Sequence, residues 1–61
     1  MSKRNETVNR IYQGAKSLRT QLSTPAKRRL RAAIEDAYDA GKAHGAQAEA
    51  AEWAAEFGVD E

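Results

Sequence analysis

Apolar side chains recur every three or four residues along the first third of the chain. They are Val8, Ile11, Tyr12, Ala15, Leu18 and Leu22. This spacing places them on one face of an α-helix. Either Ser2 or Asn5 can supply the N-cap, and Glu6 would lie favourably in the first turn. We predict a first helix over residues 6–22, weakened by about 1 kcal/mol at Gly14.

The tripeptide Ser23-Thr24-Pro25 separates this helix from a second one. A hydroxyl side chain followed by proline at the first helical position is typical of a helix start. So short a connection favours two helices that fold back on each other as an antiparallel hairpin. No residue before Gly58 forbids a helix, so we predict a second helix over residues 25–57.

The predicted second helix has two apolar faces. Projected at about 100° per residue, one continuous face carries mostly small side chains. It contains Ala26, Leu30, Ala33, Ile34, Ala37, Gly41, His44, Ala48, Ala51 and Ala55. A second strip, in the C-terminal half only, contains Ala43, Ala46, Ala50, Trp53, Ala54 and Phe57. Small residues let another helix approach closely, whereas Trp53 and Phe57 need a separate cover.

Helix length raises the question of what covers these faces. An unbroken second helix would be about 50 Å long, and the first helix reaches little more than half of that. Either the second helix breaks within residues 41–45 and its end folds back, or a second subunit covers it. Each interior glycine costs about 1 kcal/mol, but the alanine-rich flanks favour helix. On this balance we expect a continuous helix.

Charge is divided between the two halves of the chain. Nine of the ten basic residues precede Ala32, and eight of the nine acids follow it. Along the second helix this order opposes the helix dipole, which favours acids near the N-terminus. Two copies running antiparallel about a two-fold axis near Gly41 would pair residue i with roughly residue 82 − i, so that opposite charges meet. We therefore expect an all-α, antiparallel four-helix homodimer. Its expected interface consists of Leu30, Ile34, Ala37, Gly41, His44, Gly45, Ala48 and Trp53.

Composition supports a partner subunit and argues against catalysis. A chain of 61 residues without cysteine has a small core and no disulfide, so it usually needs a partner. His44 has no Asp, Glu, Cys or His three or four residues away to complete a metal or acid–base site. We expect no enzyme activity, metal or cofactor. Glu35 and Asp39 fit ordinary helix-surface pairs with Arg31 and Lys42.

The expected compartment follows from what the chain lacks. No apolar run approaches the roughly 20 residues that a bilayer span needs. No apolar signal-peptide core follows the basic start. We expect a cytoplasmic protein without membrane association.

The densest basic run is Lys27-Arg28-Arg29-Leu30-Arg31. The candidate binding surface is Lys16, Arg19, Lys27, Arg28, Arg29 and Arg31. Besides a pH-sensing or metal-dependent site at His44, two functions stay open. The first is a small non-enzymatic interaction protein, of the kind phage or plasmid genes encode. It would bind and modulate or inhibit a host protein or assembly through its charged ends or through Trp53 and Phe57. The second is an RNA- or DNA-binding regulator that grips phosphates with this basic end.

The ends and outline of the chain resemble the Rop family of plasmid copy-number regulators. The resemblance rests on the length, the hairpin, the start Met1-Ser2-Lys3-Arg4 and the ending Phe57-Gly58-Val59-Asp60-Glu61. It implies an antiparallel four-helix dimer that binds paired RNA loops through its first helices. Pro25 shortens the first helix relative to that family, and the alanine- and glycine-rich interior of the second helix differs from its heptad core.

Overall fold

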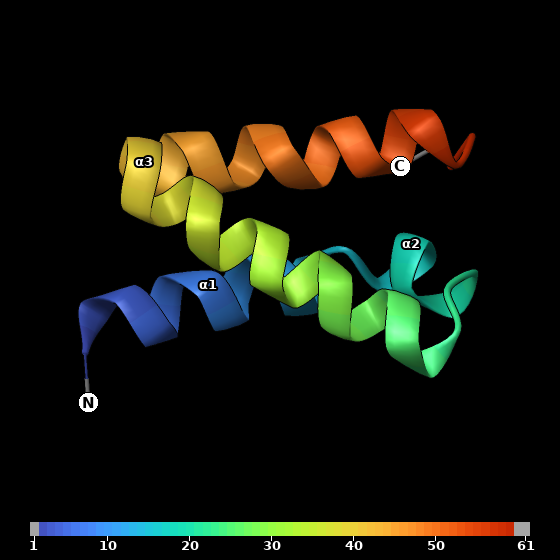
Figure 1. Cartoon of the computed structure of the whole chain (residues 1–61), viewed down its shortest axis with the longest axis horizontal. Helices are drawn as coiled ribbons and strands as arrows, with labels where there is room; N and C mark the ends of the chain where they lie inside the picture. The colour runs from blue at the N-terminus through green and yellow to red at the C-terminus, as the bar shows by residue number, and fades with distance from the viewer. Residues whose placement is uncertain (1, 60–61) are drawn as a thin grey trace.

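The computed structural model describes residues 2–59, and all the regular structure in this range is helical (Figure 1). It consists of α1 (Lys3–Gly14), α2 (Lys16–Thr20) and α3 (Thr24–Glu56). The predicted all-α class is confirmed. Met1, Asp60 and Glu61 lie outside the described residues, so the outermost parts of both ends that resemble the Rop family are not described.

α1 begins earlier than the hydrophobic pattern predicts. Of the two candidate caps, Ser2 is the one used, since its hydroxyl accepts a hydrogen bond of 3.1 Å from the backbone N–H of Asn5. The helix therefore starts at Lys3, not at residue 6. Val8, on the predicted stripe, is fully buried.

The single first helix predicted over residues 6–22 is interrupted at Ala15. Ala15 has φ −87° and ψ 47°, outside the helical region, and α1 ends at Gly14. The guanidinium of Arg19 donates to the carbonyls of Tyr12 (2.9 Å) and Gln13 (3.2 Å). The last carbonyls of a helix lack partners within it. Arg19 supplies a donor to the Gln13 carbonyl and a second donor to the Tyr12 carbonyl, which also accepts from the backbone N–H of Ala15.

α3 begins where the sequence predicts. The Ser23 hydroxyl accepts a hydrogen bond of 3.4 Å from the N–H of Ala26, and Pro25 lies in the first turn. Proline is favoured there because a backbone N–H in the first turn has no acceptor within the helix, so the absence of that N–H in proline loses no hydrogen bond.

α3 is not a continuous helix. Lys42 has φ 59° and ψ −153°, a region that is nearly restricted to glycine and costs other residues about 1–3 kcal/mol. The chain reverses at this residue, so that an N-terminal arm (residues 24–41) is followed by a C-terminal arm (residues 43–56) that runs back (Figure 1). Our expectation of an unbroken helix was therefore wrong, and the break falls in the 41–45 window given as the alternative.

The two arms of α3 meet closely at Gly45. A Cβ atom built on Gly45 would lie 2.7 Å from the carbonyl oxygen of Ala37, so only glycine fits there without a shift of the backbone. Gly45 thus lies opposite Ala37, which is the pairing of residue i with residue 82 − i that the charge pattern predicted between two subunits. Here it forms within one chain.

The reversal also changes which face of the C-terminal arm is buried. The core consists of Val8, Ala15, Leu18, Leu22, Leu30, Ile34 and Ala46. Ala50 and Trp53 pack against it, so the second apolar strip of α3 faces inward. Ala48, Ala51 and Ala55, on the expected continuous face, are exposed. The expected continuous face ends at Lys42, because this non-helical residue changes the direction of the helix axis for all the residues that follow.

Candidate functional site

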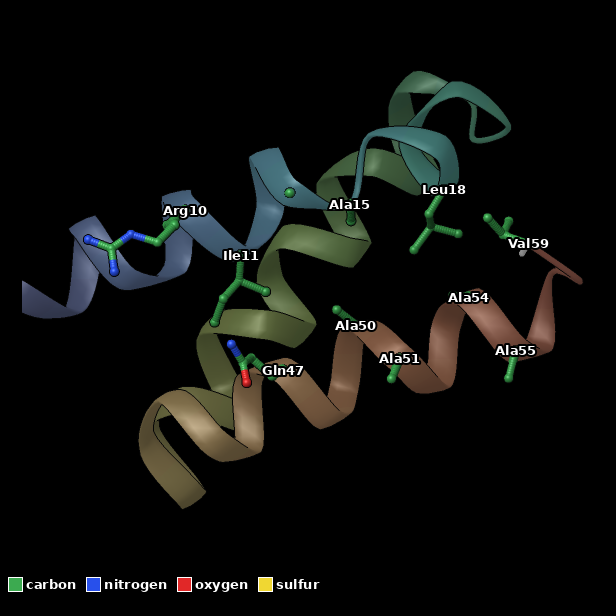
Figure 2. A pocket seen from close by; sticks show the side chains of 11 residues that line it. Arg10, Ile11, Ala15, Leu18, Gln47, Ala50, Ala51, Ala54, Ala55 and Val59 are labelled. Atoms are coloured by element: carbon green, nitrogen blue, oxygen red, sulfur yellow. The ribbon is translucent and has the colours of Figure 1, made fainter. Parts of the chain in front are cut away.

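An apolar groove of about 530 Å³ lies between α1–α2 and the C-terminal arm of α3 (Figure 2). Its first wall is formed by Arg10, Ile11, Gly14, Ala15 and Leu18. Its second wall is formed by Gln47, Ala50, Ala51, Ala54, Ala55 and Val59. The volume lies within the range of about 300–1,000 Å³ that is typical of ligand sites.

Small side chains give the groove its width. The second wall presents two neighbouring alanines on each of two successive turns, and Gly14 on the first wall has open space around it. Arg10 and Gln47 are the polar lining residues. Both lie toward one end of the groove, whereas Val59 lies toward the other (Figure 2). The arrangement provides apolar surface along most of its length and hydrogen-bonding groups at one end.

The pattern of the sequence did not reveal this groove. Ala50 and Ala54 lay on the second apolar strip, and Ala51 and Ala55 on the first, so no single face united them. The four become one wall only after the C-terminal arm folds back. The adjacent alanine pairs were the available signal, but they indicate a groove only when the break at Lys42 is known.

The eight residues expected at a dimer interface do not form one surface of the described chain. Leu30 and Ile34 are fully buried inside it. Ala37 is already in contact with Gly45 of the same chain. Trp53 is half-buried, and its indole N–H donates to the Glu49 carboxylate at 2.9 Å.

The remaining members of that set, Gly41, His44 and Ala48, are exposed near the reversal. Phe57 is also exposed, at 45% of its surface, and stacks on Trp53 with 5.8 Å between ring centroids. Trp53 is therefore covered by Phe57 and by the core of the same chain.

The basic residues divide into two groups. The guanidinium carbons of Arg19 and Arg31 lie 5.1 Å and 5.6 Å from the centroid of the Tyr12 ring, within cation–π range. Arg19 is also bonded to the end of α1, so it has a structural role that its assignment to the binding surface did not foresee. Lys16, Arg28 and Arg29 are exposed, whereas Lys27 and Arg31 are half-buried.

The ion pairs within residues 2–59 both use Arg4, which was not among the candidates. Its Nε and Nη2 atoms donate to the two carboxylate oxygens of Asp39 at 2.7 Å and 3.1 Å. Its Nη1 lies 3.7 Å from Glu35. Glu35 and Asp39 thus pair with α1 and not with Arg31 and Lys42 of their own helix. Thirty-five positions separate Arg4 from Asp39, so no local pattern could reveal the contact.

This ion pair makes the stability of the fold sensitive to acid. The hydrogen bond from Arg4 is the main cause that lowers the pKa of Asp39 below its ordinary value of 3.8. Stability from a lowered carboxyl pKa is present above the unfolded value and is lost as pH falls through the folded one. We expect Asp39→Asn to lower Tm slightly near neutral pH, because exposed ion pairs contribute little. The deficit should shrink as pH falls below the ordinary pKa of 3.8.

Thermal melts followed by circular dichroism at several pH values measure this effect. Glu52→Gln, an exposed change on the C-terminal arm, is the control and should leave Tm unchanged. If Asp39→Asn lowers Tm by the same amount down to the lowest pH, the stabilising ion pair between Arg4 and the ionised Asp39 is contradicted.

Within residues 2–59, no three His, Asp or Glu side chains gather as a metal site. The same range holds no helix that combines the length and apolar character of a bilayer span. Comparisons with protein-family models, curated proteins and solved structures give no match for this chain.

Proposed function

We propose that this protein is a non-enzymatic interaction protein that binds a helical segment of a host protein in the groove between α1–α2 and the C-terminal arm of α3. The observation that supports the proposal is the groove itself: about 530 Å³, open, and walled mainly by alanine, leucine, isoleucine and valine. Amphipathic helices bind such grooves through apolar side chains on one face.

The lining defines the chemistry of the partner. Small walls leave room for bulky side chains, so the partner contributes leucine, phenylalanine or methionine at helical spacing. Arg10 carries a positive charge at one end of the groove and forms no ion pair within residues 2–59. A carboxylate on the partner near that end would complement it. The partner segment is therefore an apolar helix face with an acid toward one terminus.

A second candidate function, nucleic-acid binding, is favoured by a different observation. None of the basic residues at positions 27–31 has a carboxylate within ion-pair distance in the described part of the chain. Arg28 and Arg29 are exposed on adjacent positions of α3, where they can contact phosphates. Such binding would weaken steeply with salt because phosphate contacts release counterions.

Two matched alanine replacements test the groove. Ala51 and Ala48 are both exposed on the C-terminal arm, but only Ala51 lines the groove. We expect Ala51→Glu to reduce recovery of the partner from a host lysate by about tenfold or more, because the bound complex would bury an unpaired charge. Ala48→Glu should leave recovery unchanged. Circular dichroism checks that both variants fold.

The same capture experiment separates the two candidate functions. Equal recovery of a protein by both variants would contradict the groove. Recovery of RNA or DNA that moderate salt removes, and that Arg28→Ala/Arg29→Ala abolishes, would replace the groove proposal with nucleic-acid binding. A protein retained at high salt and lost only with Ala51→Glu supports the groove.

A further inference from the structure

We propose that the C-terminal arm of α3 exchanges between two copies of this chain, with Lys42 as the hinge, so that the protein forms a domain-swapped dimer. In the closed subunit the arm folds back onto its own chain (Figure 1). In the dimer it would extend in line with the N-terminal arm and pack on the second copy. The partner in this case is defined by the chain itself.

The first support for exchange is the backbone at Lys42. Its φ of 59° and ψ of −153° are the only non-helical values inside α3. Lysine has no special tolerance for this conformation, and the neighbouring glycine, Gly41, stands one position too early to relieve it. When Lys42 becomes helical, α3 straightens and the strain disappears from both chains.

The second support is the identity of the contacts. In a swapped dimer, each contact of the arm in the closed subunit is formed again between chains. Gly45 would meet the Ala37 carbonyl of the other copy, and Ala46 would fill the same core position. Opening relieves the strained hinge but exposes the core, and association at sufficient concentration buries that core again. The swapped dimer therefore keeps the packing of the closed subunit without its strain.

The third support is the sequence of α3. Alanine is the best helix former, and it is the most frequent residue on both sides of the hinge. Each arm is helical up to the hinge, so only one residue has to change conformation. The extended helix would also have the antiparallel arrangement in which the basic start of α3 approaches the acidic end of the partner's α3.

Two substitutions at the hinge shift the balance in opposite directions. Lys42→Gly accepts the observed conformation without strain, so it should favour the closed monomer and weaken dimerisation by about tenfold or more. Lys42→Ile is strongly disfavoured at positive φ but is accepted in a helix, so it should strengthen dimerisation by a similar factor. Sedimentation equilibrium from about 10 μM to about 1 mM covers the range in which weak dimers form. It compares both variants with the chain mass of 6.7 kDa.

Exchange is supported if wild type and Lys42→Ile reach twice the chain mass at concentrations where Lys42→Gly remains monomeric. The proposal fails if all three sediment alike. It also fails if Lys42→Ile loses its helical circular dichroism at every concentration, because the open form would then not be helical.

Mixing donor-labelled and acceptor-labelled wild-type chains, each labelled once at position 56, adds a direct readout. Energy transfer must appear only after incubation long enough for arms to exchange. Immediate or absent transfer contradicts exchange.

Discussion

Replacing Gly45 with alanine is expected to lower the free energy of unfolding by about 1–3 kcal/mol, as for other overpacked sites. The added Cβ would lie 2.7 Å from the Ala37 carbonyl oxygen, which belongs to the backbone of a helix and cannot rotate away. The arms of α3 must therefore separate. Alanine is the better helix former by about 1 kcal/mol, so a net loss of stability shows that the close approach dominates.

Gly41→Ala is the matched control for this prediction. It lies in the same helix, and a Cβ built on it meets no atom within 4 Å. We expect it to raise Tm, because only the helix propensity changes. Thermal and urea unfolding measure both variants. If Gly45→Ala is as stable as Gly41→Ala, the arms do not pack as closely as described.

Leu30→Ala is expected to cause a loss of about 2–5 kcal/mol, typical of a large-to-small change in a core. Leu30 is fully buried, and its side chain belongs to the cluster that joins α1, α2 and both arms of α3. A domain of this size has a total stability of only about 3–9 kcal/mol at typical values per residue. The variant should therefore be partly or wholly unfolded at physiological temperature.

Phe57→Ala provides the comparison for Leu30→Ala. Phe57 is larger than leucine but 45% exposed, and its ring stacks on that of Trp53. Its loss should cost less than about 1.5 kcal/mol, since stacking and partial burial are all that is removed. Far-ultraviolet circular dichroism follows both melts. Equal losses from the two variants would contradict the placement of the core around Leu30.

Local signals in the sequence predicted local features well. Ser23 and Pro25 mark the start of α3 because capping and proline geometry depend only on adjacent residues. The apolar spacing did not predict the break at Ala15, where Arg19 bonds back to the end of α1. A hydrogen bond from a side chain to a backbone carbonyl seven positions away does not alter the spacing of apolar residues, so the spacing cannot predict it.

The sequence located the break in α3 only approximately. Gly41 and Gly45 restricted the break to a short window, but the strained residue is Lys42, between them. Helix propensity favours a straight helix, whereas the returning arm buries Ala46 and packs Trp53 against the core, and tertiary packing contributes more to helical stability than propensity does. The groove depends on that reversal, so its walls could not be read from one helical face. Energies of tertiary packing decided both features.

The stacking of Trp53 on Phe57 has a practical consequence. Trp53 is the single tryptophan of the chain, and it sits on the returning arm against the core with its indole bonded to Glu49. Its fluorescence therefore reports the docking of that arm without an added label. Undocking of the arm, which also removes the second wall of the groove, can therefore be followed optically in the unmodified chain.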